Sequence, residues 1–186
     1  MATLSKPSSG HFKGTAGSKA SYNNLSQKKD SGGIINKKGL DTREHPTKYK
    51  QMSSKRIKAL REKVDRRTIT KTEYKHMEWQ KRLTKRRNKA IKEFWKNERR
   101  LIKNNLPTTR NWNPHQRQEI LAGRQPKYKG KTMSSHHTYS VTKYPHLADK
   151  RELIYPVTFY EHVYGWHGGN TKNSLPGIPI KMIKEF

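Results

Sequence analysis

Five of the nine histidines of this 186-residue chain lie in one stretch near the C-terminus, residues 134–170. They form a doublet, a single residue and a spaced pair: His136, His137, His146, His162 and His167. Imidazole nitrogen binds divalent transition metals, and a histidine without a metal titrates near neutral pH, which suits a general base. The doublet and the spaced pair therefore predict one metal ion and one general base in a common site.

Hydrolysis of a phosphodiester needs these two groups, because a base activates the water and a cation stabilises the charge that develops on the phosphate and the leaving oxygen. Adjacent residues of a strand point to opposite sides, so His136 can face the metal while His137 faces the water. His162 and His167 are five residues apart, about 500° of helix rotation. We therefore expect the two to share a metal only if the helix ends before His167, which the neighbouring glycines favour.

A strand, a loop, a second strand and a short helix are predicted to position these side chains. Residues 138–141 alternate in strand-favouring types, and residues 153–157 form the second strand candidate. Thr158 then predicts a helix N-cap with Glu161 three residues on, and the helix should cover about residues 159–166. This order is a ββα unit, with the histidine doublet on its first strand and His162 on its helix.

A long helical region precedes this unit. Residues 54–66 carry a narrow apolar stripe, and Thr70 with Glu73 predicts the start of a second helix that reaches about residue 104. Two helices joined by a tight turn indicate an antiparallel hairpin. In the connector that follows, Asn113 and Gln116 favour the start of a further short helix.

The charge balance predicts a polyanionic partner. Lys and Arg number 42 against 14 acidic residues, a formal net charge of +28. Such a surplus of positive charge indicates nucleic acid as the first candidate partner, with an anionic membrane or an acidic protein as alternatives. We expect the exposed cations of the second helix to bind the nucleic-acid backbone: Lys81, Arg82, Lys85, Arg86, Arg87 and Lys89.

We therefore predict an α+β chain in three parts. Residues 1–47 are a flexible basic leader, residues 48–104 a basic helical arm, and residues 105–186 a small metal-binding nuclease domain. The chain has no cysteine, which excludes disulfides and cysteine-type zinc sites. It has no apolar run long enough to span a membrane and no hydrophobic segment of a cleaved signal peptide.

The histidine region resembles a known family through its spaced motifs SHHTYSV, YPHLA, LIYPVT, EH and GWHGGN. It is similar to the HNH/endonuclease VII superfamily, specifically the GHH-type nuclease domains at the C-termini of bacterial polymorphic toxins, and more distantly to DNase colicins and pyocins. The resemblance covers about residues 109–177. It implies the ββα-metal, or His-Me finger, fold. It also implies that His136 is a metal ligand, that His137 is the general base, and that His162 and His167 complete the metal shell.

Two positions depart from the family pattern. Ser135 stands before the doublet where GHH proteins have glycine, and the asparagine that orients the base histidine in HNH enzymes has no counterpart. Its place falls at Leu153, beside Glu152. We expect Glu152, Asn170 or a backbone carbonyl to hold His137 instead.

The resulting prediction is a metal-dependent endonuclease toxin that hydrolyses DNA with little sequence preference. The family argument favours Mg²⁺, while a histidine-rich shell suits Zn²⁺, Ni²⁺ or Mn²⁺. The resemblance further implies an acidic cognate immunity protein and a secretion-system carrier. It implies synthesis in the bacterial cytoplasm, export by a specialised system and action in the target-cell cytoplasm. The alternatives are a non-catalytic nucleic-acid-binding protein with a structural zinc, or an RNase with the same site.

Overall fold

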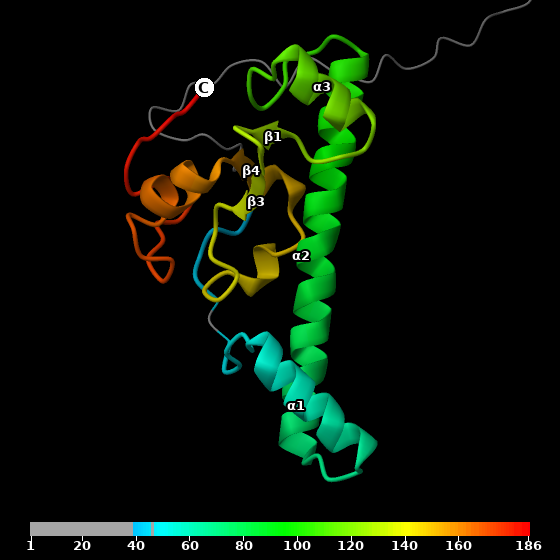
Figure 1. The fold of residues 1–186 in the computed structure, drawn as a ribbon. Coiled ribbons are helices and arrows are strands. Elements are labelled where there is room, and N and C mark those ends of the chain that lie inside the picture. Colours follow the sequence, from blue (N-terminus) through cyan, green and yellow to red (C-terminus); the bar gives the residue numbers. More distant parts are fainter. Residues whose placement is uncertain (1–38, 46) are drawn as a thin grey trace, which may run out of the picture. The chain divides into compact units, whose positions relative to one another are not determined.

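The computed structural model describes residues 39–45 and 47–186, so most of the predicted leader lies outside the described residues (Figure 1). The described residues combine helices with two small antiparallel sheets, which confirms the predicted α+β class. Residues 39–45 dock on the later chain as a loop, and His45 N–H donates to the Lys143 carbonyl over 3.0 Å. Among the described residues, no helix is both long enough and apolar enough to span a membrane.

Helices α1 (Ser54–Asp65) and α2 (Lys71–Lys103) begin where the sequence predicts them. The capping box at the start of α2 is complete, because Thr70 Oγ1 accepts from Glu73 N–H and the Glu73 carboxylate accepts from Thr70 N–H. The same carboxylate pairs with Lys63 of α1 over 2.7 Å. Helix α1 contacts α2 and buries one side chain, Leu60.

The second half of α2 belongs to the main core rather than to a separate arm. Its buried side chains pack in one cluster with residues from the later chain: Ala90, Phe94, Trp95, Ile102, Trp112, Ile120, Met133 and Ile154. Figure 1 shows the later elements arranged along one side of α2. Buried residues from α2 and from the later chain therefore share one core.

Helix α3 (Pro114–Leu121) follows with the predicted capping box of Asn113 and Gln116. A small hairpin of β1 (Lys127–Tyr128) and β2 (Lys131–Thr132) comes next, in a segment that the sequence reading treated as a connector. Lys129 and Gly130 between these strands have φ angles of 47° and 77°. Positive φ at both central residues is the mark of the tight turn that suits a two-residue hairpin loop.

The histidine doublet lies on β3 (Ser134–His137), which pairs antiparallel with β4 (Ile154–Val157). The prediction of a strand at residues 138–141 was wrong in position, because β3 ends at His137 and those residues turn away. Pairing with β4 decided the register: His137 lies opposite Ile154, and Ser134 lies opposite Val157. Two short 3-10 helices, η1 (Pro145–Leu147) and η2 (Arg151–Leu153), connect the strands.

The predicted helix after β4 is present, but most of it is wider than an α-helix. Thr158 N–H donates to Glu161 Oε2 over 3.0 Å, and Glu161 N–H donates to Thr158 Oγ1 over 3.1 Å. These bonds form the predicted capping box. Residues 159–160 are α-helical, and the π-helix η3 (Glu161–Trp166) follows directly.

Candidate metal centre

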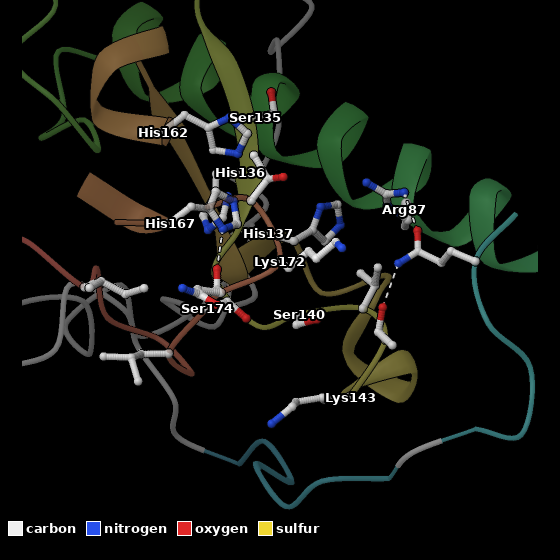
Figure 2. A pocket seen from close by; sticks show the side chains of 17 residues that line it. Arg87, Ser135, His136, His137, Ser140, Lys143, His162, His167, Lys172 and Ser174 are labelled. Carbon is white, nitrogen blue, oxygen red and sulfur yellow. Dashed lines mark hydrogen bonds between the residues drawn. The ribbon is translucent and has the colours of Figure 1, made fainter. Parts of the chain in front are cut away.

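Three histidines from two elements converge in the structure. His136 comes from β3, His162 from η3, and His167 is the residue that directly follows η3. Each offers one ring nitrogen, and these three nitrogens lie within 4.8 Å of one another. Figure 2 shows the three rings gathered together, with His137 and Arg87 nearby. Such a cluster could hold a single metal ion.

The π-helix explains how two histidines five residues apart reach the same point. His167 N–H donates to the His162 carbonyl over 3.2 Å, which is an i→i+5 bond. A helix with this bonding places residues five apart over each other, whereas an α-helix would turn them away. The structure thus brings His162 and His167 together by widening the last turn. The helix also ends at Trp166, before His167, as the sequence predicted.

The environment favours the neutral form of two of the three imidazoles. Burial, followed by the neighbouring rings of His162, His167 and His137, lowers the pKa of His136 to about 2. Burial, followed by His167, also lowers the pKa of His162. Metals bind the neutral form of histidine, so His136 and His162 are in the state that a cation requires.

One ligand is also oriented by a bond behind it. The Asn173 carbonyl can only accept, so His167 Nδ1 carries the proton that it donates to this oxygen. The lone pair of His167 then resides on Nε2, and this outer contact fixes the ring for a ligand role.

His137, the other member of the doublet, is held by a backbone carbonyl. Its Nε2–H donates to the Ala148 oxygen over 3.2 Å, which leaves Nδ1 as a free acceptor. Burial, followed by the charge of Arg87, lowers the pKa of His137 to about 4, although the bond to Ala148 opposes both. At neutral pH His137 is therefore unprotonated and able to take up a proton.

The other two residues expected to hold His137 lie elsewhere. Glu152 is exposed and accepts from Arg151 Nε over 3.2 Å. Asn170 is exposed and its Oδ1 accepts from the backbone N–H of Lys172 over 3.0 Å. Neither lines the cleft that His137 faces. Of the three possibilities raised by the missing asparagine, the structure brings only the backbone carbonyl to His137.

All four histidines open into one cleft of about 980 Å³. Arg87 reaches it from α2, where its Nη1 donates to Gln51 Oε1 over 3.3 Å and its buried Nε has no hydrogen-bond partner in the described residues. Lys143 and Lys172 line the same cleft. No motif in the sequence signalled these two lysines, because each lies in an irregular segment that only the fold brings to the site.

The six cations predicted to bind nucleic acid fall into different surroundings. Arg86 is partly exposed and is bound to the later chain, where its Nη2 donates to the His146 carbonyl over 2.7 Å and to Asp149 over 2.8 Å. Lys81 lies 3.6 Å from Glu78 on the same helix. Arg87 lines the histidine cleft. Within the described residues, the remaining three cations are exposed and have no side-chain partner: Arg82, Lys85 and Lys89.

A buried ion pair supports η3 from behind. Arg110 and Glu161 expose 2% and 4% of their side chains, and two hydrogen bonds of 2.6 Å and 2.8 Å join them. Burial raises the pKa of Glu161, but the bonds from Arg110, Glu185 N–H and Thr158 N–H lower it more, so the net pKa lies below its usual range. Glu161 directly precedes His162, so this pair anchors one side of the metal centre.

Comparison with known families agrees with this site. Residues 77–158 match Tox-GHH, described as a GHH signature containing HNH/Endo VII superfamily nuclease toxin. The match includes His136 and His137 and ends four residues before His162. No curated protein matches the chain. This match to residues 77–158 confirms the family resemblance found in the sequence.

Proposed function

We propose that this chain is a metal-dependent endonuclease toxin that hydrolyses DNA phosphodiester bonds with little sequence specificity. One observation carries the proposal: ring nitrogens of three histidines come within 4.8 Å of one another in a cleft that also contains His137. Clustered histidines of this kind seldom serve packing alone. The arrangement of β3, β4 and the helical residues 159–166 supports a ββα-metal unit, and the contact of α1 with α2 supports a basic hairpin.

In this proposal His136, His162 and His167 hold one divalent metal ion. When bound, the ion supplies Lewis-acid stabilisation of the charge on the phosphate and the leaving oxygen. The all-nitrogen donor set suits Zn²⁺, Ni²⁺ or Mn²⁺, while the family argument favours Mg²⁺. The identity of the ion is therefore part of the experiment.

His137 is the general base. The Ala148 carbonyl holds its Nε2–H, so Nδ1 faces away from that bond and draws the proton from the attacking water. The positioning role that HNH enzymes give to asparagine belongs here to the Ala148 carbonyl rather than to Glu152 or Asn170. Arg87 stays charged because a guanidinium does not deprotonate in proteins, and it provides a phosphate contact in the same cleft.

Exposed cations of α2 bind the nucleic-acid backbone. Arg82, Lys85 and Lys89 are free to reach phosphates, and phosphate contacts carry no sequence information. This supports cleavage with little sequence preference. The family further supports an acidic immunity protein, a secretion-system carrier and action in the cytoplasm of a target cell.

Incubation of plasmid DNA and total RNA with the protein tests the proposal, using Mg²⁺, Mn²⁺, Ni²⁺, Zn²⁺ or a chelator. Wild type should cut DNA with metal and lose this activity in chelator. His137→Ala should lose it at every metal, because no other group in the described part of the cleft is placed to take the proton. His115→Ala is the matched control, since His115 exposes 75% of its side chain and lies outside the cleft.

Two results would contradict the proposal: cutting that resists chelator, or equal cutting by wild type and His137→Ala. Cleavage of RNA alone would keep the site and change the substrate. Metal-dependent stabilisation without any cutting would indicate the non-catalytic protein with structural zinc. Circular dichroism of each variant verifies that loss of activity is not loss of folding.

A further inference from the structure

A second depression of about 570 Å³ lies along α2, outside the histidine cleft. Four cationic side chains line it, and none of its lining residues is a carboxylate: Lys92, Lys96, Arg99 and Arg124. Sequence reading placed the nucleic-acid contacts earlier on α2, so none of these four was predicted. Most charge runs on a helix are solvated faces of mixed sign. A concave site with one sign of charge is different, because the electrostatic potentials of its cations add up inside the hollow.

Arg99 is built into this depression. Its Nε donates to the Ile120 carbonyl at the end of α3 over 3.1 Å. Gly123 has a φ angle of +83°, and a Cβ at this position would lie 2.8 Å from Arg99 Nη2. Glycine therefore serves the left-handed backbone conformation and also leaves room for the guanidinium beside it.

The other three cations are exposed and, within the described residues, have no side-chain hydrogen bond or ion pair: Lys92, Lys96 and Arg124. Lys92 and Lys96 are four apart on α2, where like charges repel and destabilise a helix. An anion bound between them and Arg124 would turn this repulsion into attraction.

The depression connects to the histidine cleft through Ser135. Trp95 and Gln125 line the depression, and both donate to Ser135 Oγ, over 2.9 Å and 3.5 Å. Ser135 itself lines the cleft beside His136. One serine hydroxyl thus forms the border between the two hollows, so a chain molecule that leaves the metal centre past Ser135 enters the cationic depression.

We infer that this depression is a second phosphate-binding subsite, which holds the backbone of the same nucleic-acid strand that the metal centre cleaves. The inference rests on the proposed nuclease function and adds the path of the substrate. The phosphate lies between Lys92, Lys96 and Arg124, and Arg99 forms the fixed wall. The contact is to the backbone, so it orients the strand without reading its bases.

The salt dependence of DNA binding tests this subsite. We would measure binding of a fluorescent duplex in the His137→Ala background, which prevents cleavage, and compare Lys96→Gln/Arg124→Gln with Lys181→Gln/Lys184→Gln. The control pair is exposed, removes the same charge and lines neither hollow. Loss of the one phosphate contact that Lys96 and Arg124 share should lower the slope of log K against log salt by about 0.9. The control pair should leave the slope unchanged. Equal slopes for both double variants would overturn the inference.

Crosslinking locates the strand independently. The chain has no cysteine, so Lys96→Cys introduces a single thiol that can carry a photoactivatable group. This variant should crosslink to DNA, whereas Lys184→Cys should not, and similar yields from both would reject the subsite. Neither measurement requires hydrolysis. Failure of the subsite would therefore appear in these binding experiments, whereas failure of the proposed function would appear in the cleavage experiment.

Discussion

The buried pair of Arg110 and Glu161 supports the helical segment that carries His162, and Arg110→Met tests this support. The guanidinium makes two bonds to Glu161 and further bonds to the carbonyls of Pro156, over 2.9 Å, and Phe186, over 3.2 Å. Methionine retains the aliphatic stem but leaves the Glu161 carboxylate buried without its counter-charge. Removal of one partner of such a pair costs about 3–5 kcal/mol.

Urea denaturation measures the fall in the free energy of unfolding, and thermal denaturation measures the fall in melting temperature. Both are followed by circular dichroism, with each protein prepared free of metal. For a chain of this size we expect a fall in melting temperature of about 2–4 °C per kcal/mol, or roughly 6–20 °C in total. Zinc affinity, measured by calorimetry, should also fall, because Glu161 precedes the proposed ligand His162. Arg100→Met on the exposed face of α2 is the matched control and should change stability by less than about 0.5 kcal/mol.

The double variant Arg110→Met/Glu161→Gln separates charge from packing. Glutamine keeps an acceptor for Thr158 N–H but carries no charge, so the double variant should be more stable than Arg110→Met alone. A cost below about 1 kcal/mol for Arg110→Met, or a double variant less stable than the single one, would refute this account of the pair.

Two further predictions concern pH and the N-terminal helix. The folded pKa of His136, about 2, lies below its ordinary value of 6.5, so the unfolded chain takes up the proton first. The metal-free protein should therefore lose about 1.4 kcal/mol per pH unit from this residue as pH falls below 6.5. Between pH 7 and 5, the free energy of unfolding should depend less steeply on pH for His136→Gln than for wild type. His115→Gln should leave this dependence unchanged. Leu60→Ala should cost about 2–4 kcal/mol, because Leu60 is 1% exposed and is the buried residue of α1. Hydrogen exchange should show the loss in α1 first, and unchanged exchange there would contradict the prediction.

Features that depend on neighbours in the chain were predictable from the sequence. Thr70 with Glu73, and Asn113 with Gln116, form the predicted capping boxes at the predicted positions. Each box joins residues three apart, so its energy is set locally and no distant contact is needed.

Features that depend on distant contacts were not predictable. Residues 138–141 favour a strand by type, but pairing of His136 with Tyr155 in β4 placed the strand earlier. The side-chain period of a strand is two, so buried partners on one face decide its register. Likewise, α2 joins the core through contacts such as Trp95 with Trp112, which link residues that local patterns do not connect.

The same distinction between local and distant features applies to the candidate site. Residue type and spacing alone singled out His136, His137, His162 and His167, because imidazole chemistry depends on the side chain itself. Only the tertiary structure decided how they are used. Strand pairing brought β3 to η3, the i→i+5 turn aligned His167 with His162, and the loop between the strands placed the Ala148 carbonyl against His137. These three outcomes depend on backbone geometry and on contacts between separate segments, which no single stretch of sequence specifies.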